Sequence, residues 1–443
     1  IIIILIYFFI FNKRLKMKEI KLILLFSCVI FILVLFDTEN RPDAYLYHLP
    51  YSQILNENKI IIGLSNLHFR FAHISIFQYL ASFNLTLWSG LNGLILPAAI
   101  YCIMIFLYFL NDLTDITDKK INYGKIFSLL IFTYICLRIN RFGEFGNDAM
   151  AHLTIFYLVS KFIYLDATKI SSFKKILFLS VFAFLNKPFL IFSFFFPFYL
   201  FLKNKFKINL AIFNLATIFF IFWIFKNILI SGCVLFPIEK TCFESLSWSD
   251  KKEFYTQINL ESEAWAKGWP QRENKNISKN QFIKKFNWIE AWKKEQLKNF
   301  LKNLVPFVII LFFIFIFMKG NYLFEKDADK EKKKVIIFFS LIGTIFFFLK
   351  FPLYRYGYSY LIVLINFIYI FNLKKINIEK INKFSKYFLI ICIIGITAKQ
   401  FQKIYKYSAE RTPIPSDRNL SLVNQQKIRE IKISDNFIYY YSN

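Results

Sequence analysis

Long uncharged runs of apolar residues are the feature that most limits what this chain can fold into. LILLFSCVIFILVLF (residues 22–36) and LVPFVIILFFIFIF (residues 304–317) contain no charged side chain, and they approach the roughly 17 to 25 residues that a helix needs to cross a bilayer. Hydrophobic residues make up 56% of the chain and phenylalanine occurs 59 times, more apolar length than a water-soluble domain could bury. A transmembrane barrel would instead show alternating strands of about ten residues. We therefore expect an all-α polytopic membrane protein with about 9–11 transmembrane helices.

The formal net charge of +27 comes from lysines grouped in short clusters between the apolar runs. This grouping favours orientation by the positive-inside rule over nucleic-acid binding. We place the short basic clusters in the cytoplasm: residues 12–21, 118–120, 174–175, 203–207, 326–334 and 372–386. The segments between them then face outward: residues 37–83, 138–150, 186–188, 233–300 and 350–358. The long outer segment is also rich in lysine, but long loops are translocated largely regardless of charge.

The same pattern divides the chain into four parts. We expect an N-terminal membrane module with the first two outer loops (1–232), a long outer loop with an amphipathic helix (233–300), C-terminal transmembrane helices (301–397) and a short outer tail (398–443). Residues 176–202 are short for two full crossings, so we expect a hairpin of two short helices broken at Asn186-Lys187-Pro188. The first residue is Ile1, and Met17 opens a basic stretch before the first long apolar run. The sequence thus predicts either a truncated start or a start at Met17.

Two outward segments collect the polar residues that could form a site. Residues 37–73 hold three of the four histidines (His48, His68 and His73), together with Asp37, Asp43 and Arg70. In RINRFGEFGNDAMAH (138–152), Asn147 is a suitable N-cap and Asp148 sits in the first turn of the next helix, sharing a face with His152. One interpretation is that Asp148 only stabilises this helix end and that His152 is an ordinary interfacial histidine. The other is that carboxylates of the first two outer loops converge on one outward-facing pocket.

The order of these pieces resembles the GT-C superfamily, which comprises integral membrane glycosyltransferases that use polyprenyl-phosphate sugars. The matching pieces are Asp43 in DTENRPDAYLYHLP, Asp148 in GEFGNDAMAHL and the hairpin FAFLNKPFLIFSFFFP with Lys187 at its turn. The resemblance covers roughly residues 17–230. The chain is also similar to uncharacterised bacterial membrane proteins associated with surface polysaccharides, through GLSNLHFRF (63–71), SGCVLFPIEKTCF (231–243) and the Trp265–Trp269 pair. Acidic residues after the first helix are often adjacent or one apart in the superfamily, whereas Asp37 and Asp43 are six apart.

The resemblance implies an enzyme in the bacterial inner membrane, with its active face in the periplasm. It would move a sugar from a polyprenyl-phosphate donor to a cell-surface glycan or a lipid acceptor. The alternatives are a transporter or flippase of a lipid-linked saccharide, and a non-catalytic polysaccharide assembly protein. No internal repeat of the kind that builds transporters from inverted halves is apparent in the sequence.

This chemistry assigns roles to the candidate residues. Asp43 is the expected base for the acceptor hydroxyl, with Asp148 as the second catalytic carboxylate, and Asp37 is a helix-end charge. Arg355 and Arg70 are candidates for the departing phosphate, because a guanidinium binds phosphate oxygens bidentately; an arginine that snorkels to the interface is the alternative for each. The remaining expected substrate-binding residues are His48, His68, Glu144, His152 and Lys187.

A metal, a disulfide and the tryptophans complete the expectations. A divalent cation, Mg²⁺ or Mn²⁺, held by Asp43 and Asp148 is an option that the residues leave open. Cys233 and Cys242 lie on the outer side, where disulfides persist, and we expect them to pair. Trp288 and Trp292 are four apart and indicate an amphipathic helix on the membrane surface. The outer tryptophans are either interfacial anchors or stacking platforms for sugar rings.

Overall fold

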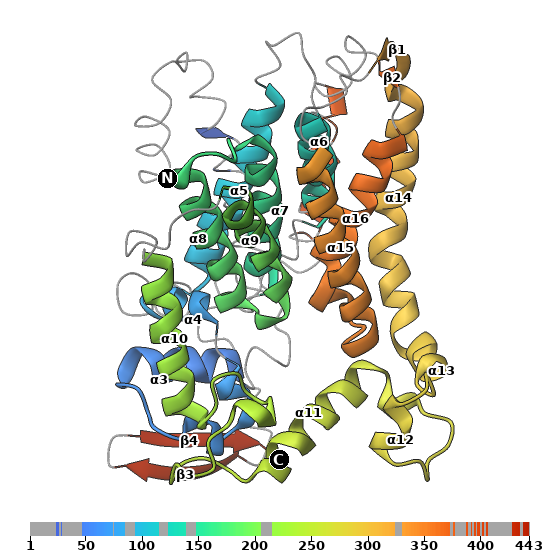
Figure 1. Ribbon diagram of the computed structural model, residues 1–443. Helices are drawn as coiled ribbons and strands as arrows, with labels where there is room; N and C mark the ends of the chain where they lie inside the picture. Colours follow the sequence, from blue (N-terminus) through green and yellow to red (C-terminus); the bar gives the residue numbers. More distant parts are fainter. Residues whose placement is uncertain are drawn as a thin grey trace.

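The computed structural model of the protein is a bundle of long helices with shorter elements at one end (Figure 1). It describes residues 47–73, 75–84, 94–114, 123–138, 148–204, 215–323, 330–372, 428–434 and 437–442, and short pieces at 24–25, 28, 375–376, 387–388, 391, 394–395, 397–398, 401–402 and 405. The bundle consists of α5 (Leu96–Thr114), α6 (Tyr123–Arg138), α7 (Asp148–Tyr164), α8 (Ile170–Asn186), α9 (Phe195–Asn204), α10 (Leu215–Ser231), α14 (Lys298–Met318), α15 (Lys330–Lys350) and α16 (Tyr354–Asn372). The predicted helical fold is thus found in the described residues.

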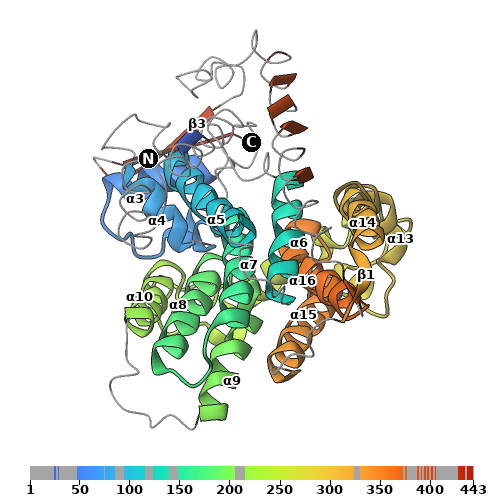
Figure 2. The same ribbon diagram turned by 90° about the horizontal axis from the view of Figure 1, so that it is seen from above.

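Helix α7 lies inside the bundle and packs against α5, α6, α8 and α16 (Figure 2). Its side chains from Ala149 to Ile163 are almost all buried. Phenylalanines from neighbouring helices interlock around it, and Phe106, Phe132 and Phe156 are fully buried. Hydrogen bonds cross between helices inside this apolar core, from Tyr101 to Thr154 at 2.6 Å and from Tyr108 to Ser160 at 3.0 Å. The depth of α7 in the bundle fixes the position of Asp148 at its first residue.

The predicted hairpin is present, and the local sequence explains where it turns. α8 ends at Asn186, a 3₁₀ helix η7 (Pro188–Phe194) follows, and α9 leads away from it. A residue before proline is restricted to extended backbone, and Lys187 adopts φ −150° and ψ 100°. Pro188 is tolerated as the first residue of η7 because its missing N–H would be unpaired there in any case. This turn holds Lys187 at the end of the bundle where α7 begins.

Helices α15 and α16 form the opposite wall and approach each other closely. A Cβ atom at Gly343 would collide with Tyr360, and one at Gly357 would collide with Phe347. Glycine is therefore needed at both positions for the close approach of the two helices. The tight packing sets the start of α16, which carries Arg355 and Ser359.

The described part of residues 47–84, which we call the first outer segment, lies beside the end of α10. It contains α3 (Leu49–Glu57), two 3₁₀ helices, η2 (Leu64–Asn66) and η3 (Phe69–Ala72), and α4 (Ile76–Ser82). Gly63 donates its backbone N–H to Leu229 at 2.9 Å, and Asn66 donates to the Trp248 carbonyl at 3.0 Å. Trp248 in turn donates its indole N–H to Ile228 at 2.9 Å. Phe69 packs in the apolar cluster that contains Cys233 and Phe236, so the sequence pieces 63–71 and 231–243 lie close together.

The second outer segment, residues 232–297, folds into short helices. These are η9 (Glu239–Thr241), α11 (Lys252–Ala266), η10 (Trp269–Gln271), α12 (Lys279–Ile283), α13 (Ile289–Trp292) and the π-helix η11 (Lys293–Leu297). Cys233 and Cys242 form the predicted disulfide, with a Cα–Cα distance of 3.9 Å. Glu263 pairs with Lys267 at 2.6 Å and with Lys350 at 3.2 Å, which joins α11 to the end of α15.

Three findings bear on the sequence-based expectations. Trp288 and Trp292 are buried rather than spread on a surface, because both pack against Phe348 and Trp292 donates to the Pro352 carbonyl at 2.7 Å. Two short antiparallel strand pairs accompany the helices: β1 (Lys319–Leu323) with β2 (Lys375–Ile376), and β3 (Ile428–Ser434) with β4 (Phe437–Ser442).

The third finding concerns the number of spans. Among the described residues, two helices are long and apolar enough to cross a membrane, at 96–113 and 289–316, and shorter apolar helices lie at 188–204 and 215–231. The other long helices are shorter or less uniformly apolar. α7 and α8 have 17 residues each, and α15 opens with KEKKK. The expected 9–11 spans therefore remain a prediction.

Candidate functional site

An ion pair between Asp148 and Lys187 lies at the centre of the candidate site. Lys187 Nζ is 2.6 Å from Asp148 Oδ1, and the two side chains are 9% and 30% exposed. Asp148 is the first residue of α7, where the helix dipole favours a carboxylate. Lys187 reaches it from the hairpin turn after α8, 39 residues later in the chain. The ammonium is almost enclosed, whereas one side of the carboxylate remains open to its surroundings.

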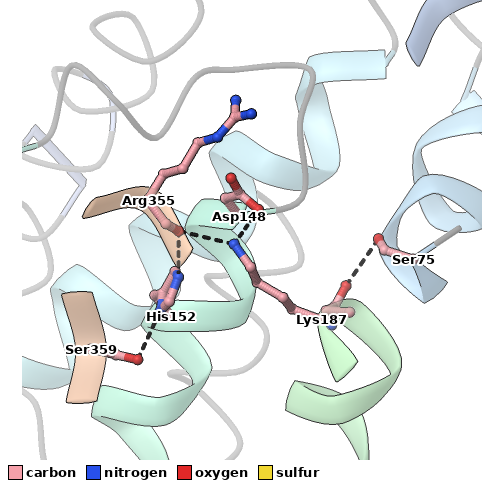
Figure 3. A network of polar contacts seen from close by, with 7 residues as sticks. Ser75, Asp148, His152, Lys187, Arg355 and Ser359 are labelled. Atoms are coloured by element: carbon pink, nitrogen blue, oxygen red, sulfur yellow. Dashed lines mark hydrogen bonds and ion pairs between the residues drawn. The ribbon is translucent and has the colours of Figure 1, made fainter. Parts of the chain in front are cut away.

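The backbone at the start of α16 closes the site from the opposite wall (Figure 3). The Arg355 carbonyl accepts hydrogen bonds from Lys187 Nζ and from His152 Nε2, both at 2.9 Å. Because a carbonyl oxygen only accepts, His152 must carry its proton on Nε2. In the neutral ring, Nδ1 then accepts from the Ser359 hydroxyl at 2.7 Å. His152 is fully buried, so this contact pattern favours the interpretation of His152 as a residue that positions α7 against α16.

The Arg355 side chain adds a second cation near the carboxylate. Figure 3 shows this side chain extending past Asp148 and away from His152. Its guanidinium carbon lies 5.8 Å from the ring centroid of Trp265 and 5.3 Å from that of Tyr356. Lys187 Nζ lies 4.4 Å from the same Tyr356 ring. Two cations and one carboxylate therefore share a small volume, and the described part of the site has a surplus of positive charge.

Hydrogen bonds to Asn186, the residue before Lys187, join the hairpin turn to the first outer segment. Asn186, next to Lys187, accepts from the Ser75 hydroxyl at 3.3 Å and from the Phe77 backbone N–H at 3.2 Å. Ser75 caps α4, and Gln78 completes the capping box by accepting from the Ser75 N–H. Gln78 Nε2 is also 3.0 Å from His48 Nδ1. His48 therefore belongs to the same polar network as Lys187, through α4.

His68 and Arg70 lie elsewhere in the first outer segment. The Arg70 backbone N–H donates to His68 Nδ1 at 3.2 Å, and the Arg70 guanidinium covers the rings of Tyr47 and Phe69 at 4.8 and 5.5 Å. Partial burial, and then the positive charge of Arg70, lower the pKa of His68 below its usual 6.5. These contacts join the two residues to the aromatic rings of their own segment, and a role for either in binding substrate stays a prediction.

Two of the predicted acidic residues, Asp43 and Glu144, lie outside the described residues, and so does Asp37. Within the described parts of the chain, no group of three His, Cys, Asp or Glu side chains is placed to hold a metal ion. Of the two carboxylates expected to act in catalysis, the described residues include Asp148, and its Oδ1 atom is already bonded to Lys187. A cation shared between Asp43 and Asp148 therefore stays a prediction.

Sequence reasoning missed several residues of the network, namely Ser75, Asn186, Tyr356 and Ser359. Asn186 had a visible signal, because it directly precedes the Lys187-Pro188 turn. Ser75 followed by Gln78 matches a capping box, which marks a helix start. Tyr356 and Ser359 carry no comparable sequence signal. Their roles depend on the packing of α16 against α7 and the hairpin.

The model of one protein family, described as "Domain of unknown function (DUF8201)", matches residues 1–362. No curated protein matches the chain, and no solved structure does. The matched range contains every candidate site residue described above.

Proposed function

The chain belongs to the DUF8201 family, whose model matches most of its length, and we propose that it is a membrane glycosyltransferase. It would transfer a sugar from a polyprenyl-phosphate donor to a cell-surface glycan or lipid acceptor, at the periplasmic face of a bacterial inner membrane. The observation that carries this proposal is the convergence of Asp148, Lys187 and Arg355 from three distant parts of the chain.

Exposed apolar side chains on the outside of the bundle support the membrane part of this proposal. On α10, Phe222 and Phe225 are 66% and 61% exposed, and on α14 Phe312 is 61% exposed. Patches of this kind on a helical bundle are typical of contact with lipid or with another protein. The first and second outer segments gather at one end of the bundle, and β1 and β2 lie at the other (Figure 1). This separation agrees with the expected assignment of the basic clusters to the opposite face.

The charges of the site suit the departure of a lipid phosphate. In the transfer, the bond between the sugar and the phosphate oxygen breaks, and a bond between the sugar and the acceptor oxygen forms. The acceptor proton goes to a carboxylate, and the phosphate leaves with added negative charge. Arg355 and Lys187 are placed to stabilise that charge, and surroundings with little water strengthen the interaction. A polyprenyl phosphate would reach them from the bilayer.

Asp148 fits a supporting role better than that of the base. A carboxylate 2.6 Å from an ammonium group is stabilised in its charged form and is a weak proton acceptor. Asp148 would orient Lys187 toward the phosphate, and its open side would contact a sugar hydroxyl. The base would be Asp43, which the resemblance aligns with the acidic residue of the first outer loop.

The test uses the full chain in proteoliposomes with a panel of synthetic polyprenyl-phosphate sugars and membranes as the source of acceptor. Release of polyprenyl phosphate and transfer of labelled sugar are both measured. We expect Asp43→Asn to abolish transfer, and Arg355→Met to slow it by about 10² to 10³, the usual effect of removing one donor to a developing oxyanion. Arg272→Met is the matched control, because Arg272 also covers a tryptophan ring, at 4.0 Å, and is remote in sequence from the network.

Two results would reject the proposal. One is wild-type transfer rates in both Asp43→Asn and Arg355→Met. The other is movement of the intact lipid-linked sugar between leaflets without release of polyprenyl phosphate, which is the behaviour of a flippase.

A further inference from the structure

Four polar groups are buried where the first outer segment meets α10. They are the ammonium of Lys226, the indole N–H of Trp223 and the hydroxyls of Tyr51 and Tyr79, which we call the Lys226 cluster. All four can donate a hydrogen bond, and the ammonium and the indole can do nothing else. Buried polar groups in proteins nearly always have a partner. The hydroxyls of Tyr51 and Tyr79 interact with each other, whereas the Lys226 ammonium and the Trp223 indole N–H have no partner within the described residues and need an explanation.

The four groups line one contact between helices. Lys226 and Trp223 are three residues apart and share the inward face of α10, with Lys226 Nζ 5.0 Å from the Trp223 ring centroid. The same Nζ lies 5.9 Å from the ring of Tyr79 in α4. Tyr51 and Tyr79 both pack in the apolar cluster that contains Ile230, one turn further along α10. α3 and α4 therefore cover the Lys226 side of α10.

Ordinary explanations for a lysine at this position do not fit. A lysine that snorkels sends its ammonium out to water, whereas Lys226 is only 7% exposed and its Nζ is buried. The aromatic rings nearby interact favourably with a cation, but they do not replace the hydrogen bonds that the ammonium has lost. No acceptor within the described residues bonds it. An anion with several acceptor oxygens would supply the hydrogen bonds that these donors lack.

The position in α10 indicates where this anion comes from. Lys226 lies five residues before Ser231, where α10 ends, or about 7.5 Å from that end at 1.5 Å per residue. Phe222 and Phe225, on neighbouring positions of the same helix, are exposed. If α10 crosses the bilayer, as the membrane part of the proposed function requires, Lys226 lies at the depth of lipid headgroups. We propose that the Lys226 cluster is an oxyanion site that binds a phosphate group, separate from the Asp148–Lys187–Arg355 site.

Thermal unfolding of the delipidated full chain in an uncharged detergent tests this proposal. Dihexanoyl phosphatidic acid supplies a lipid phosphate, sodium phosphate supplies the free ion, and dihexanoylglycerol is the matched lipid without phosphate. A ligand that binds the folded state raises the midpoint of unfolding. We expect phosphatidic acid to raise it and dihexanoylglycerol to leave it unchanged. A rise with sodium phosphate as well identifies a site for any phosphate, and a rise with phosphatidic acid alone identifies a lipid headgroup site.

The variants connect the effect to Lys226. Lys226→Met should bind phosphatidic acid at least about tenfold more weakly, because one charge-assisted hydrogen bond is lost. Without ligand the same variant should unfold at a higher temperature than wild type, because a buried amino group without a hydrogen-bond partner has been removed. Lys302→Met is the control. Lys302 lies about one turn from the end of α14 that adjoins the second outer segment, and its side chain is exposed. It should bind as tightly as wild type.

The proposal is overturned if neither phosphate probe stabilises the wild-type protein, or if Lys226→Met gains the same stabilisation as wild type. Should Lys226→Met fail to fold, Tyr79→Phe removes one hydroxyl oxygen only, and unchanged affinity in that variant rejects the site. Arg355→Met, which removes a cation of the Asp148–Lys187–Arg355 site, should retain the full effect of phosphatidic acid. A failure of the glycosyltransferase proposal would therefore leave this result untouched.

Discussion

The Asp148–Lys187 ion pair gives a prediction in which the two partners are unequal. Lys187 is 9% exposed and Asp148 is 30% exposed. Removal of the carboxylate strands an ammonium group that water hardly reaches, whereas removal of the ammonium leaves a carboxylate that water still solvates. Asp148→Ala should therefore destabilise the fold more than Lys187→Met does.

The magnitudes follow from the surroundings of each group. Breaking a buried ion pair by deleting one partner costs about 3–5 kcal/mol. For Asp148→Ala we expect a cost at the lower end of this range, about 3 kcal/mol, because Lys187 keeps its hydrogen bond to the Arg355 carbonyl. Loss of the interaction between the carboxylate and the helix dipole adds about 0.5 kcal/mol. For Lys187→Met we expect about 1 kcal/mol, because the partial exposure of Asp148 screens the loss. The coupling energy of the pair should be about 2 kcal/mol.

Equilibrium unfolding in mixed micelles, followed by tryptophan fluorescence, measures both single variants and the double variant. The matched control is the pair Lys169 and Asp166, in which the same two residue types lie 3.7 Å apart with side chains 69% and 49% exposed. We expect no measurable coupling there, because exposed ion pairs contribute little. Two results would refute the reasoning: a coupling no larger than that of the control pair, or a greater cost for Lys187→Met than for Asp148→Ala.

Two further predictions concern the outer segments. Replacing Cys233 and Cys242 together by serine should lower the free energy of unfolding by about 2–3 kcal/mol, because the disulfide closes a loop between residues nine apart in sequence. Denaturant unfolding of wild type and variant, with and without reductant, measures this change. The prediction is contradicted if reductant destabilises the variant as much as it destabilises wild type. Burial and the charge of Arg70 lower the pKa of His68 in the folded state, so folding favours the neutral ring. The contribution of His68 to the free energy of unfolding is therefore present above the unfolded pKa of about 6.5. It is lost as the pH falls toward the folded pKa. Between pH 7 and pH 5, the midpoint of thermal unfolding should therefore drop more in wild type than in His68→Asn. The Asn side-chain oxygen can still accept the hydrogen bond from the Arg70 N–H. Equal dependence of the two midpoints on pH would show that His68 does not contribute.

Short-range sequence signals were sufficient for several elements of this protein. Pro188 and the restriction it places on Lys187 predicted the hairpin, and Asn147-Asp148 predicted the start of α7. The expected location of Cys233 and Cys242 on the outer side of a membrane predicted their disulfide. These features depend on a few neighbouring residues, whose backbone preferences do not require the rest of the fold.

The sequence therefore determined by itself the helical class, the hairpin turn and which charged residues were available to form a site. The tertiary structure decided which of them meet. The Arg355 carbonyl between Lys187 and His152, the burial of Trp288 and Trp292, and the unpaired Lys226 all depend on the packing of helices far apart in the chain. The apolar runs are similar to one another, so their composition does not specify which helix faces which. That choice is made by close packing, at positions such as Gly343 and Gly357, and by hydrogen bonds that cross between helices.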